Sequence, residues 1–195
     1  MNKPITTTLV EIRKHGPCKD GWEILLKHLG GTKADFNAAI DLLTILDING
    51  LADCLWCARS THGHDRLWRL YVVWCVRQVQ HLMTDDRSIA ALDVAERFAN
   101  GNATADELAA ARVTARAVSW ARAGAAMAWA AGAAAGVTSW AIEDATEAVW
   151  AAARAASWAT ARSTARATGA DWATARAAQE AKLRQILTAG EYDAK

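Results

Sequence analysis

The sequence predicts an all-α protein, and three observations carry this prediction. Apolar residues recur with helical spacing along the whole chain, without the alternation of half-buried strands. Both prolines, Pro4 and Pro17, lie near the start, so no proline interrupts a later helix. Alanine, the best helix former, is abundant in the second half. We expect one compact unit, in which an N-terminal multi-helix part (1–102) packs against an Ala/Trp/Arg-rich long-helix part (103–195).

Short helices are expected first, because turn residues follow one another closely in this part of the chain. The predicted ranges are Thr8–His15, Gly21–Leu29, Asp41–Asp47 and Leu51–Arg59. They end at turn or glycine signals, namely Gly16-Pro17, Gly30-Gly31, Asn49-Gly50 and His62-Gly63-His64. The second helix is expected to bury Trp22, Leu25, Leu26 and Leu29.

A central helix is predicted at Arg66–Met83. Its residues from Leu67 to Val76 leave almost no polar face, and a helix that is apolar all round is buried all round. A further helix, Ser88–Ala99, follows the N-cap candidates Asp85 and Asp86.

The Ala-rich part opens with a capping box, in which Thr104 precedes Glu107 by three residues. Helical sequence then continues to about residue 189. We expect a break within Gly132–Ser139 and a final helix that opens at Thr168–Asp171. Three long helices are therefore expected, packed closely because alanine lets helix backbones approach.

Charge and composition limit the partners and the cellular compartment that we expect for the protein. The chain has 22 basic and 21 acidic residues, which argues against a nucleic-acid coat or a membrane surface. No secretory segment opens the sequence, so we expect a cytoplasmic protein with reduced thiols.

The uncharged stretch Ala123–Ile142 contains Gly132 and Gly136 at GxxxG spacing. Its residues are too weakly apolar for a membrane span, so we interpret it as a close helix contact, within the chain or in a homodimer.

Several residues could bind a metal ion, but the sequence predicts no metal, cofactor or catalytic residue. Cys54 and Cys57 form a CxxC near His62 and His64, which would suit zinc, but their apolar helical surroundings favour buried thiols. Cys75 and His81 lie on different faces of one predicted helix. Glu143, Asp144 and Glu147 form an acidic cluster that would suit a divalent cation or the positive end of a helix. A metal-dependent hydrolase that uses the two histidines and this cluster is the least favoured function.

The most unusual feature is a ladder of large side chains at four-residue spacing: Trp150, Arg154, Trp158, Arg162 and Arg166. Arg112, Arg116 and Trp120 repeat it earlier in the chain. Residues four apart share a helix face, and arginine over tryptophan forms a cation–π pair. The ladder either holds Ala-rich helices together, which we favour, or forms a recognition patch for nucleotides or an acidic protein. The candidate binding residues are Arg154, Trp158, Arg162, Arg166, Arg112 and Arg116.

Four segments resemble a group of small immunity proteins encoded in phage and bacterial genomes. They are 20–30 (DGWEILLKHLG), 42–59 (LLTILDINGLADCLWCAR), 90–101 (AALDVAERFANG) and 103–112 (ATADELAAAR), followed by the Ala/Trp/Arg run. The resemblance implies a non-enzymatic helical protein that binds and neutralises a toxin or, in a phage setting, a host defence component. The alternative is sequestration of a nucleotide-type signal in an Arg/Trp-lined pocket. The resemblance assigns no functional residues.

Overall fold

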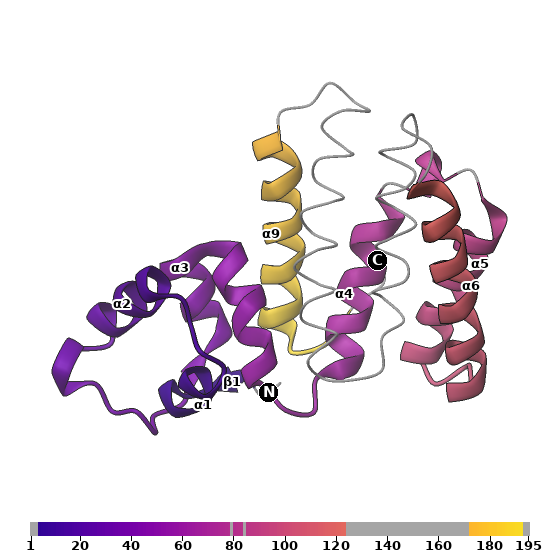
Figure 1. Ribbon diagram of the computed structural model, residues 1–195. Helices are drawn as coiled ribbons and strands as arrows, with labels where there is room; N and C mark the ends of the chain where they lie inside the picture. The colour runs from indigo at the N-terminus through magenta and orange to yellow at the C-terminus, as the bar shows by residue number, and fades with distance from the viewer. Residues whose placement is uncertain (1–3, 79, 84, 124–171, 193–195) are drawn as a thin grey trace. The chain divides into compact units, whose positions relative to one another are not determined.

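Helix accounts for 73% of the residues that the computed structural model describes, which are 4–78, 80–83, 85–123 and 172–192. Seven α-helices and one two-stranded sheet lie in these ranges (Figure 1), so the all-α class is confirmed. The chain divides into two compact units, one formed by 1–64 with 182–195 and the other by 65–181. The part boundary predicted after residue 102 lies inside the second unit.

A small sheet in the first unit was not predicted. Strand β1 (Thr6–Thr7) pairs antiparallel with β2 (Ile40–Asp41), with Thr6 opposite Asp41 and Thr7 opposite Ile40. The backbone N–H of Leu42 donates to the carbonyl of Ile5 at 3.0 Å and extends this pairing. Two residues per strand are too few to show alternation in the sequence, so the expectation of a purely helical chain is wrong in this detail.

The first unit contains α1 (Leu9–Lys14), α2 (Lys19–His28) and α3 (Leu42–Cys57), with 3₁₀ turns at Gly31–Lys33 and Ala58–Ser60. Thr8 caps α1, because its Oγ1 accepts a hydrogen bond from the N–H of Glu11 at 3.1 Å. Asp41 caps α3 in the same way through the N–H of Leu43 at 2.9 Å. The predicted stops at Gly16 and Gly30 are confirmed, since α1 and α2 end just before them.

One prediction about this unit is confirmed and another needs correction. The helix stop predicted at Asn49-Gly50 is confirmed, because Gly50 has the non-helical angles φ +80° and ψ 179° and forms a kink between two helical segments of α3. Of the four residues expected to be buried on α2, Leu25 is buried, while Trp22, Leu26 and Leu29 are half-buried. This narrower buried stripe fits a helix whose principal helical neighbour is α3. The large side chains of the core are Ile5, Leu9, Ile12, Leu42, Ile45, Leu46 and Leu55.

The second unit is built around α4 (Asp65–Arg77), followed by η3 (Gln80–Leu82), α5 (Asp86–Ala99), α6 (Ala105–Ala123) and the start of α9 (Trp172–Ala189). The predicted burial of α4 is confirmed along its length: Leu67, Trp68, Arg69, Leu70, Tyr71, Val72, Val73, Cys75 and Val76 are buried. Even Arg69 is 5% exposed, with its guanidinium 5.1 Å from the centre of the Phe98 ring.

The central helix is shorter than predicted, because α4 ends at Arg77 and not at Met83. The guanidinium of Arg77 pairs with Asp93, at 2.7 Å, and with Glu96, both on α5. These partners come from another helix, so the sequence around Arg77 carries no sign of them. A single 3₁₀ turn, η3, then leads towards α5.

Several predictions for the Ala-rich part lie outside the described residues. They are the GxxxG of the segment Ala123–Ile142, of which only Ala123 is described, the break within Gly132–Ser139 and the helix start at Thr168–Asp171, although the final helix itself is described as α9. Within the described ranges, each helix is too short or too polar to cross a bilayer.

Candidate functional site

A surface cavity that the described residues define lies between α5 and α6, which lie side by side (Figure 1). The start of α5 is fixed by Asp85, whose Oδ1 accepts the N–H of Arg87 at 3.0 Å. The Arg87 side chain donates two parallel hydrogen bonds to the same carboxylate, from Nε to Oδ1 at 3.0 Å and from Nη2 to Oδ2 at 2.9 Å. These hydrogen bonds raise the pKa of Arg87, and the fork geometry orients its guanidinium.

The start of α6 is fixed by the predicted capping box, which the structure confirms. The N–H of Glu107 donates to Oγ1 of Thr104 at 3.2 Å, and the N–H of Thr104 donates to Oε2 of Glu107 at 2.7 Å. Arg97 also donates to Oε1 of Glu107 at 3.1 Å. The backbone hydrogen bond from Thr104 is the main reason that the pKa of Glu107 is lowered, so this carboxylate is ionised at neutral pH.

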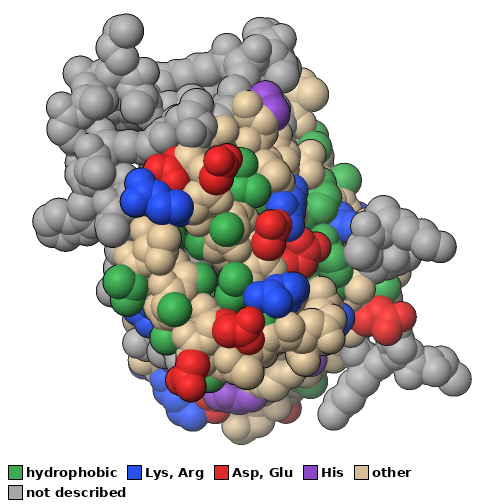
Figure 2. All heavy atoms as spheres, turned by 90° about the vertical axis from the view of Figure 1, so that its right-hand side faces the viewer, with side chains coloured by type: hydrophobic (Ala, Val, Ile, Leu, Met, Phe, Trp, Pro, Cys, Tyr) green, Lys and Arg blue, Asp and Glu red, His purple; other side chains and the backbone are tan. Residues whose placement is uncertain are grey.

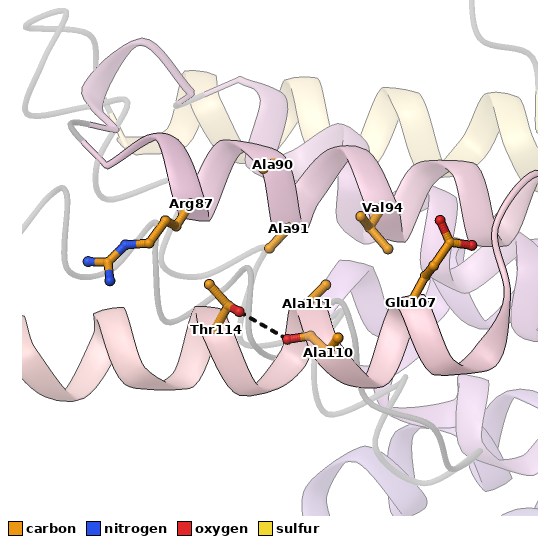
Figure 3. A pocket seen from close by; sticks show the side chains of 8 residues that line it. All are labelled: Arg87, Ala90, Ala91, Val94, Glu107, Ala110, Ala111 and Thr114. Atoms are coloured by element: carbon orange, nitrogen blue, oxygen red, sulfur yellow. Dashed lines mark hydrogen bonds between the residues drawn. The ribbon is translucent and has the colours of Figure 1, made fainter.

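Between these two fixed ends lies a shallow cavity of about 330 Å³, which we call the α5–α6 groove (Figure 3). Small and branched side chains dominate its lining, and one charge stands at each end. The lining residues are Arg87, Ala90, Ala91, Val94, Glu107, Ala110, Ala111 and Thr114.

The two walls of the groove carry the same residue pattern. On α5, a charged residue is followed by alanines three and four positions later and by a β-branched residue seven positions later: Arg87, Ala90, Ala91 and Val94. On α6, Glu107, Ala110, Ala111 and Thr114 repeat this spacing. Figure 3 shows the helices running in opposite directions, with Arg87 level with Thr114 and Val94 level with Glu107. The groove is therefore nearly symmetric in shape and opposite in charge at its two ends.

Exposed apolar surface continues from the groove onto α6. Among the described residues, two large apolar side chains are exposed, Ile24 at 50% and Val113 at 69%. Val113 follows Ala110 by three residues and so lies about 60° round the same helix. Figure 2 looks onto this side of the molecule and shows apolar side chains among acidic and basic ones.

The predicted binding residues do not line this groove. Arg112 lies on α6 and is half-buried, and Arg116 lies further along the helix, with its side chain outside the described part. The rest of the ladder, Arg154, Trp158, Arg162 and Arg166, is outside the described residues. Both interpretations of the ladder, as a contact that holds helices together or as a recognition patch, therefore stay predictions.

The cysteines predicted to be buried thiols are buried. Cys54 is 0% exposed, and its Sγ donates to the carbonyl of Leu42 at 3.4 Å. Burial, helped by the charge of Asp53, raises the pKa of Cys57 to about 12. Nε2 of His62 lies 3.9 Å from a carboxylate oxygen of Glu11. Across the described ranges, no group of three or more His, Cys, Asp and Glu side chains is placed to hold a metal ion.

Cys75 is likewise buried, at 0% exposure, and burial raises the pKa of its thiol to about 12. His81, the base considered for it, is an exposed residue of η3. A thiol that keeps its proton at neutral pH is a poor nucleophile, so the interpretation of Cys75 as a structural residue agrees with its surroundings.

Comparison of the chain with protein-family models, with curated proteins and with solved structures gives no match. The resemblance to immunity proteins therefore stays a prediction. Sequence reasoning missed the α5–α6 groove, although the repeated pattern of 87–94 and 107–114 was a signal for it.

Proposed function

We propose that this protein is a non-enzymatic binding protein that neutralises a protein partner, a toxin or a host defence component, through the α5–α6 groove. The observation that carries the proposal is the groove itself, in which an apolar floor is flanked by fixed opposite charges. The resemblance to immunity proteins supplies the biological class of the partner.

The dimensions of the groove favour one helix of that partner. The lining positions span seven residues on each wall, which corresponds to about 10 Å, or two helical turns. Alanines on both walls allow the close approach of another backbone. The occupant is a helix with small apolar residues along one face, an acidic residue towards Arg87 and a basic residue towards Glu107.

Site-specific photocrosslinking tests this docking surface. A photoreactive amino acid at Ala110 should crosslink to a defined partner in a host lysate, and the same group at the exposed Ala52 of α3 should not. The partner identified by mass spectrometry is then purified, and its affinity is measured for two matched variants. Ala110→Glu places a charge in the groove and should weaken binding at least about tenfold, because an unpaired charge in an apolar contact is costly.

Ala52→Glu adds the same charge to the first unit and should leave the affinity within about twofold of the unmodified chain, as expected for a change outside the contact. Equal binding by both variants would place the partner on another surface and contradict the proposal.

Sequestration of a nucleotide-type signal depends on Arg154, Trp158 and Arg162, which lie outside the described residues, so it stays a second prediction. Mass spectrometry of small molecules released from the purified protein tests it separately.

A further inference from the structure

Two asparagines of this chain, Asn49 and Asn100, are followed directly by glycine. In such a pair the backbone nitrogen of the glycine can attack Cγ of the asparagine, because glycine has no Cβ atom that hinders the approach. The new C–N bond closes a succinimide ring. The Cγ–Nδ2 bond breaks, and Nδ2 leaves as ammonia with the proton of the glycine N–H. Water then opens the ring at either carbonyl, which yields aspartate or isoaspartate.

The first pair lies inside a packed helix. Asn49 is half-buried within α3, between the buried residues Leu46 and Leu51. Its Nδ2 donates to the carbonyl of Gly21 on α2 at 2.8 Å and to Oδ2 of Asp53 at 3.0 Å. Attack on Asn49 therefore requires the contact between α2 and α3 to open.

The second pair lies at a helix end. Asn100 is exposed and caps the C-terminal end of α5 with ψ 6°, an angle that turns the nitrogen of Gly101 away from Cγ. Rotation towards Cγ is opposed by a hydrogen bond from the N–H of Gly101 to the carbonyl of Phe98 at 3.0 Å. The Asn100 side chain is also held, since Nδ2 donates to the carbonyl of Glu96 at 3.0 Å and Oδ1 accepts from Nη2 of Arg66 at 2.9 Å.

We infer that Asn100 is a site of spontaneous deamidation in the folded protein and that the structure protects Asn49. Helix ends open at a lower free energy than packed helices, so the hydrogen bonds of Asn100 are released more often than those of Asn49. This chemistry requires only water, and it is independent of the proposed function.

Deamidation changes the connection from α5 to α6. The aspartate product cannot donate to the carbonyl of Glu96, and its charge lies at the negative end of the α5 dipole. Isoaspartate also adds a CH₂ group to the backbone, inside the turn in which the N–H of Asn102 donates to the carbonyl of Arg97 at 2.8 Å. Because the Arg97 side chain donates to Glu107, the change acts next to one end of the α5–α6 groove.

Peptide mapping of the full chain tests the inference. The tryptic peptides 34–59 and 98–112 each contain one asparagine followed by glycine and one followed by alanine, which are Asn37 in the first and Asn102 in the second. The folded protein is kept at neutral pH and body temperature, and fragmentation mass spectrometry follows the conversion of each amide to a carboxylate. Asn100 should convert at least about tenfold faster than Asn49, and faster than Asn37 and Asn102.

The same measurement in urea separates the effect of structure from that of sequence. Unfolding removes the protection of both pairs, so Asn49 and Asn100 should then convert at rates within about threefold of each other. If Asn49 converts as fast as Asn100 in the folded protein, or if Asn100 does not convert there, the inference is wrong.

A pair of arginine variants tests the restraint on the Asn100 side chain. Arg66→Ala removes one hydrogen bond and should speed the conversion of Asn100 in the folded protein by about two- to tenfold. Arg13→Ala, which changes an exposed arginine of α1, is the matched control and should leave the rates at Asn49 and Asn100 unchanged. Equal rates at Asn100 in the two variants would contradict the role given to its hydrogen bonds.

Discussion

Replacing Gly21 on α2 by alanine is expected to destabilise the protein, although alanine is the better helix former. A Cβ atom at Gly21 would lie 2.5 Å from Oδ2 of Asp53 on α3 and 3.1 Å from Sγ of Cys18. The Asp53 carboxylate has little freedom to move away. Its Oδ2 accepts a hydrogen bond from Nδ2 of Asn49 at 3.0 Å, and the same amide group donates to the carbonyl of Gly21 at 2.8 Å.

Two opposing effects determine the magnitude. The gain in helix propensity from glycine to alanine is at most about 1 kcal/mol, and less in the first turn of a helix. Overpacking at a tight contact costs about 1–3 kcal/mol. We therefore expect Gly21→Ala to lower the free energy of unfolding by about 1–2 kcal/mol, as measured by urea denaturation followed by circular dichroism.

A double-mutant cycle separates the two effects. In an Asp53→Ala background the 2.5 Å contact is absent and only the milder 3.1 Å approach to Sγ of Cys18 remains, so Gly21→Ala should become neutral or stabilising by up to about 1 kcal/mol. If Gly21→Ala stabilises the unmodified protein, or destabilises both backgrounds equally, the close approach of Gly21 and Asp53 is not what restricts this position.

Three further predictions concern the pH dependence, the caps and the core. Because burial raises the pKa of Cys75 from 9.0 to about 12, the unfolded chain releases this proton first, and stability falls as the pH rises from 9 towards 12. In Cys75→Ala, the stability lost between pH 8 and pH 10 should be smaller by about 1.4 kcal/mol in urea melts, and an unchanged loss would contradict the burial argument. Thr104→Ala should cost about 1 kcal/mol, because α6 loses its cap, whereas Thr114→Ala in the middle of α6 should cost almost nothing. Leu92→Ala should cost about 2–5 kcal/mol in the same assay, since Leu92 is 0% exposed, and a cost below 1 kcal/mol would show that this part of the core collapses around the change.

Features with a local signature were predictable from the sequence. The capping box at Thr104 and Glu107 and the cap at Asp85 involve residues within three positions of each other, and both occur as expected. The burial of α4 follows from its composition alone. In each of these cases, neighbouring residues supply the hydrogen bonds or the apolar faces that determine the structure.

Features that depend on distant partners were not predictable in this way. The pairing of Thr6 with Asp41 joins residues far apart in the chain, and two-residue strands show no alternation. Arg77, the last residue of α4, forms ion pairs with Asp93 and Glu96 from another helix. The α5–α6 groove belongs to the same class, because its two walls become one site only after the helices pack.

The distribution of the four cysteines gives the protein a natural labelling site. Cys18 is exposed, while Cys54, Cys57 and Cys75 are buried. A maleimide dye added to the native protein should therefore attach at one position, in the first unit, whereas the α5–α6 groove belongs to the second. Fluorescence anisotropy of that dye would report the slower tumbling of a dimer or a partner complex, without any substitution in the groove.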